Sequence, residues 1–564
     1  MNARALRPVP GNAGLSAAPM PLRQGGRGGH APAPLLWALL PLLALAQGAA
    51  WWAAGGGGAV AWGGGAALAG LRGGAWALRG AGGLRWPGLL MVALPGQLLA
   101  GGLAVLARQG LASHPAWLAL LVLLLPMALL LLWEARLLAD SLFARAYRRR
   151  HPALGQAGGP EPRVSVHLPT QDMPPALLRD TLDHLAELDY GALEVLVLDS
   201  SHSPESWEPV AEHCARLGPR FRFFHLGAGQ RAARNFALRE MAPDAALVAT
   251  LEPGCRVQPD WLRHAVPFFR DPGLGFVQAA ACAPERGAPL AERLAHAADA
   301  SRWPRVQRAR NEHRAVPLRP ALALIRRPAL EMAGGWDEAA PCQPAELGLR
   351  LLRQGWDGLE LADGLAAGHV PAVPQASVAG LLHGLRRHGA ALLNPRHRGL
   401  SPAQRRHLLA EPAASAGDAL WLALAVLALP WTLALAAARL LEAAPLLPFL
   451  LPALMLPLFR LAQAALLAPR GYRALAGLAA LATMPERGAA LWRAALAPTA
   501  ETGRPHRLVS LLLALLAGAA GSLGLGGAQG LGWAGVLLLL AVPCAAALAL
   551  RRQARPAPAE WEAG

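Results

Sequence analysis

Three polar residues, Thr170, Asp199 and Glu252, each follow a short apolar segment in the central part of the chain. The apolar segments have the length and composition of buried β-strands, and stretches with a helical pattern separate them. This alternation is typical of an α/β sheet with parallel strands, in which ligands bind at the carboxyl ends of the strands. Carboxylates at that edge can hold a divalent cation. The sequence therefore predicts a ligand site that includes these three residues.

The elements that must position this site follow from hydrophobic periodicity. Predicted strands cover 163–168, 193–198, 221–226 and 246–251, and predicted helices cover 176–188, 204–217 and 231–241. The strand Leu193-Glu-Val-Leu-Val-Leu198 is almost continuously apolar, as expected for a strand buried on both faces. We therefore expect a central α/β domain with a parallel sheet.

The overall composition indicates a membrane protein. Of 564 residues, 54% are hydrophobic and 16% are charged, which is too apolar for an ordinary soluble protein. The net charge is +17, and all 53 basic residues are arginine in a chain rich in alanine, glycine, proline and leucine. That composition is typical of a GC-rich bacterial genome. No nucleic-acid-binding motif accompanies the positive charge, so nucleic acid is not expected as a partner.

Apolar runs divide the chain into regions. We expect a disordered tail over 1–33, about four spans over 34–140, a soluble domain over 151–412, and about four spans with an interfacial helix over 418–551, before a short tail at 552–564. A helix of roughly 20 apolar residues crosses a bilayer. The expected spans are a hairpin over 35–71 and single helices near 87–107, 116–139, 418–440, 445–467, 507–528 and 531–550, and an amphipathic helix is expected within 470–505.

Arginine clusters predict the orientation of these spans. Clusters precede the first span, follow the second and follow the fourth, and Arg551-Arg552 follows the last. Arginine near span ends favours the cytoplasmic side. The sequence therefore predicts a multi-pass protein of the bacterial inner membrane, with the soluble domain and both termini in the cytoplasm and membrane lipid around its helices. The five cysteines form no Cys-x-x-Cys pair, so neither a zinc site nor a disulfide framework is indicated.

Several motifs occur in the order found in family 2 membrane glycosyltransferases, the group that contains cellulose synthase, and the soluble segment resembles their GT-A-type domain. The matching stretches are Val164–Thr170, Leu196–Asp199, Ala228–Asn235, Pro259–Leu262, Gly275–Gln278, Leu324–Arg327, Gly334–Trp336, Ala345–Arg350 and Leu400–His407. The resemblance implies inverting transfer of a sugar from a nucleotide donor, such as a UDP-sugar, to a growing glycan acceptor. It also implies a Mg²⁺ or Mn²⁺ cofactor. Thr170, Asp199, Asn235 and Glu252 would bind the donor, and Asp199 would contact its uracil.

The chain departs from this family at its metal and base positions. The family's metal-binding Asp-x-Asp is Glu252-Pro253-Gly254 here, so one carboxylate remains as a weak metal ligand or as a solvated side chain. The acidic residue that acts as general base is replaced by Pro344, which has no proton-accepting group. Glu346 is a weak substitute, because two positions along a helix turn a side chain by about 200°. Asp337 and Glu338 are further candidates.

The acceptor motif is also incomplete. The family's Gln-x-x-Arg-Trp corresponds to Leu382–Arg386, where Arg386 or Arg387 is the only remnant. Arg386 could bind a phosphate bidentately, or it could belong to the basic face of an interfacial helix. Trp336 could stack on an acceptor sugar or could pack in the core.

Two functions are compatible with this pattern. The first is a catalytically weak or inactive family 2 protein that binds a nucleotide, a glycan or an active synthase partner. The alternative is an active but divergent polysaccharide synthase.

Overall fold

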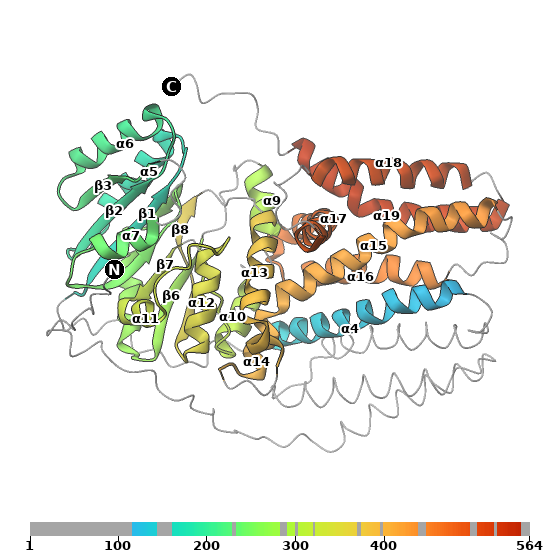
Figure 1. Ribbon diagram of the computed structural model, residues 1–564, viewed down its shortest axis with the longest axis horizontal. Helices are drawn as coiled ribbons and strands as arrows, with labels where there is room; N and C mark the ends of the chain where they lie inside the picture. The colour runs from blue at the N-terminus through green and yellow to red at the C-terminus, as the bar shows by residue number, and fades with distance from the viewer. Residues whose placement is uncertain are drawn as a thin grey trace, which may run out of the picture.

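The computed structural model describes residues 115–143, 161–227, 233–281, 290–298, 303–319, 322–368, 374–394, 399–437, 447–496, 505–523 and 527–553. Figure 1 shows a sheet covered by helices at one end and a bundle of long helices at the other. The predicted N-terminal tail, the hairpin over 35–71 and the span near 87–107 lie outside the described residues.

One mixed sheet forms the core of the first part. Its eight strands lie in the order β3-β2-β1-β4-β7-β6-β8-β5. Their bounds are β1 Arg163–Thr170, β2 Leu193–Asp199, β3 Phe221–His225, β4 Ala245–Thr250, β5 Cys255–Val257, β6 Leu274–Ala281, β7 Ala323–Arg326 and β8 Asp357–Gly368. The first four strands in this order are parallel, at the positions predicted.

The expectation of a parallel sheet was wrong for part of the other half, where only β6 and β8 pair in parallel. β7 runs antiparallel to both β4 and β6, and β5 runs antiparallel to β8. A parallel crossover needs about a dozen residues, but only 251–254 separate β4 from β5. The chain therefore turns sharply after β4, and β5 joins the opposite edge of the sheet.

Helices cover both faces of the sheet. On one face, Val164, Val166 and Leu168 of β1 pack in a core that includes α5 and α6, and on the other face Leu196 and Leu198 of β2 pack in a core that includes α7, α11 and α12. Alternate strand residues thus point into two cores. The helices of this part are α5 Pro175–Ala186, α6 Pro204–Leu217, α7 Ala233–Glu240, α8 Trp261–Ala265, α11 Arg327–Met332 and α12 Gln343–Arg353.

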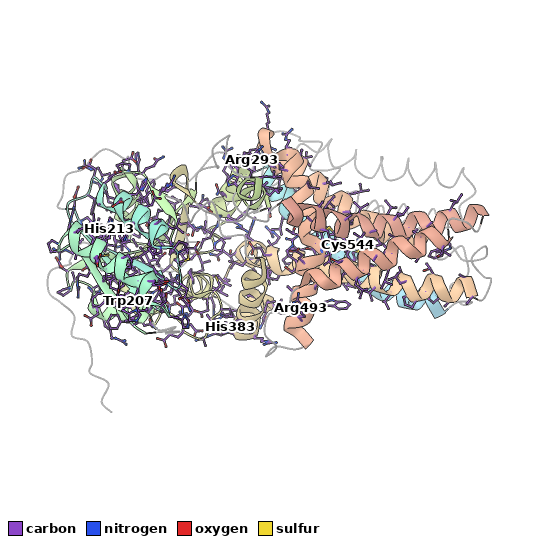
Figure 2. The ribbon with its side chains drawn as sticks, turned by 90° about the horizontal axis from the view of Figure 1, so that it is seen from above. Trp207, His213, Arg293, His383, Arg493 and Cys544 are labelled. Carbon is purple, nitrogen blue, oxygen red and sulfur yellow. The ribbon has the colours of Figure 1, made fainter. Side chains whose placement is uncertain are left out.

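The second part is a helical bundle with its own apolar core. Trp421 and Trp533 are completely buried there, and Cys544 lies among the same helices (Figure 2). The long helices are α4 Pro115–Phe143, α15 Ala410–Ala437, α16 Leu447–Leu467, α17 Arg473–Leu496, α18 Pro505–Leu523 and α19 Gly527–Gln553. Between the two parts lie α9 Leu290–Ala298, α10 Pro304–Glu312, α13 Pro374–Leu393 and α14 Pro402–Leu408 (Figure 1).

Two of the described helices contain segments long and apolar enough to cross a bilayer, Ala410–Thr432 and Leu531–Ala549. Shorter apolar segments occupy Leu456–Leu467 and Val509–Leu523. The amphipathic helix predicted within 470–505 corresponds to α17, which packs against α15, α16 and α19.

A polar joint connects the end of α4 to α14 and to the residue after α10. Arg406 Nε donates to Asp140 Oδ2 at 3.0 Å, and the rings of His313 and His407 stack with centroids 5.0 Å apart. Ligand atoms of Asp140, His313 and His407 lie within 4.8 Å of one another. The Arg406 guanidinium binds the same carboxylate and its charge opposes a divalent cation there. We therefore interpret this cluster as a structural contact that connects the three segments.

Candidate functional site at the carboxyl edge of the sheet

Asp199 is the organising residue at the ends of β1 and β2. Its side chain is buried, and it accepts hydrogen bonds from Thr170 Oγ1 at 2.9 Å, from Ser201 Oγ at 2.7 Å and from Ser201 N at 3.1 Å. His225 Nδ1 lies 2.9 Å from Asp199 Oδ2. The structure thus brings two predicted donor-binding residues, Thr170 and Asp199, into direct contact. Each carboxylate oxygen already has two partners, so a donor base would have to displace one of them.

Further residues, which the sequence analysis did not identify, connect the loops that follow β1 and β2. Asp172 has a positive φ of 47°, and its backbone N–H donates to Ser201 Oγ at 2.8 Å. His202 donates its backbone N–H to Asp172 Oδ1, and the hydrogen bonds from His202 lower the pKa of Asp172. Trp207, labelled in Figure 2, stacks on His225 with ring centroids 4.6 Å apart. The loops that follow β1 and β2 are therefore held together by side chains from four elements or loops.

Glu252 lies in the tight turn between β4 and β5. It is partly buried, Cys255 N donates to its backbone oxygen, and Gly254 N donates to Thr181 Oγ1 of α5 at 2.9 Å. Gly254 has φ +87°, a conformation that favours glycine. Pro253 and Gly254 carry no ligand side chain. The turn is therefore rigid, and it presents a single carboxylate.

A divalent cation does not fit this turn. Mg²⁺ is usually bound through one or two carboxylates together with substrate phosphates, and this turn offers the minimum of one carboxylate. Here Glu252 interacts electrostatically with the guanidinium of Arg234, which already carries a positive charge. The positive charge of this guanidinium opposes a further cation near Glu252, and no step through a metal follows from these residues.

Asn235 joins α7 to the loop that contains Trp336. Its Nδ2 donates to Trp336 O at 2.9 Å and to Glu338 Oε1 at 2.7 Å, and its Oδ1 accepts from Trp336 N at 2.9 Å. Gly335 has φ +77°, and a Cβ there would lie 2.9 Å from Asn235 Oδ1. The glycines before Trp336 are thus required by backbone conformation and by close approach. The side chain of Asn235 thus positions the Trp336 loop, and its predicted role in donor binding stays a prediction.

Trp336 is enclosed and is not presented to solvent. It is 3% exposed and packs in the core on the α7 side of the sheet. The guanidinium of Arg234 lies over its ring, with Cζ 5.1 Å from the ring centroid. Stacking of an acceptor sugar on this ring would require both partners to move.

Pro344 is buried in the first turn of α12, and the residues around it make structural contacts. Glu346 is also buried, accepting from Arg350 Nε at 2.8 Å with His388 Nε2 at 3.1 Å. Burial raises the pKa of Glu346, but the hydrogen bonds from His388 and Arg350 outweigh it and hold the pKa below its usual value. Arg350 donates onward to Gly335 O at 2.8 Å. Glu346 therefore clamps α12, α13 and the loop before Trp336 together.

The basic residues of α13 face Asp337 and Glu346. Arg387 forms an ion pair with Asp337, and Nε2 of His383, which is labelled in Figure 2, lies 3.4 Å from the same carboxylate. Burial raises the pKa of Asp337, but the Ala339 N–H bond and the Arg387 charge bring it below its usual value. Arg386 and Arg387 are both exposed, and Arg387 pairs with Asp337 and lies 3.7 Å from Glu346 Oε1. The two alternatives for Arg386, a phosphate ligand or part of a basic helix face, stay predictions.

The imidazole of His167 on β1 is buried within the sheet domain. It is 0% exposed, it pairs in register with Thr250 of β4, and neither ring nitrogen has a partner among the described residues. Burial and the charge of Arg234 lower its pKa to about 3. The imidazole is therefore neutral in the folded protein at ordinary pH.

This burial predicts a pH-dependent stability. An unfolded His has a pKa near 6.5, so below that pH the unfolded chain binds more protons and the free energy of unfolding falls. His167 alone should reduce it by about 2 kcal/mol between pH 6.5 and pH 5. His407, whose pKa burial lowers to about 4, adds to the same trend.

Melting curves at both pH values test this expectation. His167→Leu should flatten the pH dependence, whereas His264→Leu, an exposed histidine, should leave it unchanged. An unaltered pH dependence in His167→Leu would show that the imidazole is hydrated and protonates without unfolding.

Residues 165–331 match the family model of glycosyl transferase family 2. The sheet domain is a family 2 glycosyltransferase domain. The match spans β1 to α11 and includes Thr170, Asp199, Asn235 and Glu252. It confirms the resemblance drawn from the sequence motifs, and the sheet is the mixed α/β sheet of a GT-A-like domain.

Solved glycosyltransferase structures are also similar to this chain. The mannosyltransferase PcManGT from Pyrobaculum calidifontis, in complex with GDP-Man and Mn²⁺, is 18% identical, with a TM-score of 0.37 over 75% of this chain and 99% of its own. S. aureus TarS 1–349 is 13% identical, with a TM-score of 0.31 over 59% and 90%. Its complex with UDP-GlcNAc is 14% identical, with a TM-score of 0.32 over 59% and 91%. The comparison with curated proteins found no match.

Proposed function

We propose that this protein is a membrane-embedded family 2 glycosyltransferase homologue that binds a nucleotide-sugar donor but transfers sugar weakly or not at all. The observation that carries the proposal is the state of the base position. Pro344 occupies it, and the nearby carboxylates of Asp337 and Glu346 are both paired with basic side chains of α13. A general base normally contributes about 10²–10⁴-fold to the rate, and a carboxylate with a lowered pKa is a weak base.

Donor binding is supported by the intact first half of the domain. The β1–β4 half of the sheet, where family 2 proteins bind the nucleotide, has the predicted parallel order, and Thr170 and Asp199 meet at its carboxyl edge. Asp199, Ser201 and His225 give that edge a fixed geometry. The edge of the sheet proposed to bind the donor is therefore ordered, whereas the acceptor side is altered at the base position.

Membrane embedding is supported by the surface of the helical bundle. Large apolar side chains are exposed on it, among them Leu129 at 55%, Leu458 at 56%, Leu511 at 61% and Leu531 at 60%. Apolar patches of this kind mark surfaces that contact lipid or another protein. We propose that α4, α15, α16, α18 and α19 belong to a multi-span arrangement in a bacterial inner membrane, with the sheet domain in the cytoplasm.

Binding and turnover measured on the same preparation test this function. Purified full-length protein should bind UDP or GDP by isothermal titration, and should release little diphosphate from UDP-glucose, UDP-GlcNAc or GDP-mannose in a coupled assay. Absence of binding to any nucleotide would refute the donor role. Turnover at the 1–10³ s⁻¹ typical of enzymes would instead support the active alternative. Asp337→Asn and Glu346→Gln would then identify the base.

A further inference from the structure

The position of Arg234 raises the question of what neutralises a donor diphosphate in this protein. A nucleoside diphosphate carries negative charge that family 2 enzymes commonly balance with a metal ion, and the Glu252 turn does not fit one. Arg234 lies in the first turn of α7 and interacts electrostatically with Glu252. A permanent cation is thus already present within electrostatic range of the remaining carboxylate of the metal motif.

The guanidinium of Arg234 is held in a fixed position. Its Cζ lies 5.1 Å from the centroid of the buried Trp336 ring, and its Nη1 donates to Gln343 Oε1 at 3.2 Å. Trp336 is in turn fixed by its two hydrogen bonds to Asn235, the neighbour of Arg234 on the same helix. A planar guanidinium that is stacked and hydrogen-bonded in this way is preorganised for an anion.

The surroundings of Arg234 favour an additional anion. Its Nε is completely buried and has no acceptor among the described residues. The amino-terminal turn of a helix carries partial positive charge, which disfavours a cation and favours an anion. The neighbouring His167 is neutral and offers no negative charge. Within the described part of the chain, Glu252 is the main opposing charge of a desolvated guanidinium whose Nε has no acceptor.

We propose that Arg234 takes the place of the divalent cation at the donor diphosphate, so that this protein binds a nucleoside diphosphate without metal. Glu252 balances the guanidinium when the donor is absent, and Trp336 and Gln343 hold it at the edge of the sheet. Arginine suits this role because it binds phosphate oxygens bidentately and stays charged. The inference rests on the donor binding proposed above.

Isothermal titration of the full-length protein in detergent tests the proposal, with UDP and GDP as probes and uridine and guanosine as their phosphate-free counterparts. Exchange of EDTA for Mn²⁺ should change the dissociation constant of the diphosphate less than threefold. Arg234→Met should weaken it by about tenfold to a hundredfold, because charge-assisted hydrogen bonds are lost, and Arg234→Lys should weaken it less. Binding of the nucleoside should stay within about twofold of wild type.

Arg239→Met is the matched control, since it removes one arginine from the exposed end of the same helix and should change nothing. A melting curve for each variant shows whether the domain is folded. Diphosphate binding that strengthens tenfold with Mn²⁺ and ignores Arg234→Met would overturn the proposal while leaving donor binding intact. No binding of UDP or GDP under any condition would overturn the donor role itself, and this inference with it.

Discussion

Replacing Asp199 with alanine should lower the free energy of unfolding by about 3–5 kcal/mol, the usual cost of removing one partner from a buried charged network. The reason is the number of groups that the carboxylate satisfies. Thr170, Ser201 and His225 all hydrogen-bond to it, and its side chain is only 1% exposed. Hydrogen bonds to charged groups contribute about 1.5–3 kcal/mol each. Thr170 and Ser201 are buried, so water does not readily replace the carboxylate as their acceptor.

The expected change is a fall in melting temperature of roughly 6–20 °C for a domain of this size. Hydrogen exchange provides the local measurement, because the amides of 200–203 and of β3 should lose protection before the rest of the sheet. Asp183→Asn is the control, since this aspartate is half exposed and pairs with His213 on the surface, where an ion pair contributes about 0–1 kcal/mol. Equal melting temperatures for Asp199→Ala and wild type would show that the network contributes no stability.

Arg460→Met should have an effect of similar size in the helical bundle. Arg460 of α16 is an ion-pair partner of Glu134 of α4 and of Asp418 of α15, and Asp418 also pairs with Arg487 of α17 at 2.8 Å. Glu134, Asp418 and Arg460 are all buried. Removal of Arg460 leaves two buried carboxylates with one arginine, and such unpaired charges cost about 3–5 kcal/mol.

Thermal unfolding in detergent, followed by tryptophan fluorescence, measures this loss. Arg473→Met, at an exposed position where α17 begins, is the control and should melt like wild type. The double variant Arg460→Met with Glu134→Gln should recover part of the lost stability, because one uncompensated charge is removed. A double variant that is less stable than Arg460→Met alone would contradict the charge-pairing explanation.

Local sequence patterns were sufficient to predict the first half of the sheet. The strands from β1 to β4 and helix α6 occur within one or two residues of their predicted bounds, because each strand is a short apolar run and Pro204 marks the start of α6. The meeting of Thr170 and Asp199 follows from the parallel order, since carboxyl ends of neighbouring parallel strands lie at one edge. The order of the motifs also indicated the family, because each motif lies at the end of an element that the sequence predicts.

Tertiary packing alone decided the rest. The antiparallel β7 and the far position of β5 depend on connections whose paths no periodicity specifies. The pairing of Arg387 with Asp337 and Glu346 depends on how α13 rotates against α12. Arg234 could not be distinguished by type from 52 other basic residues, and only the contacts of its guanidinium with Trp336 and Gln343, within electrostatic range of Glu252, give it a role. Sequence thus determined which residues end the strands, and long-range packing determined which charges face one another there.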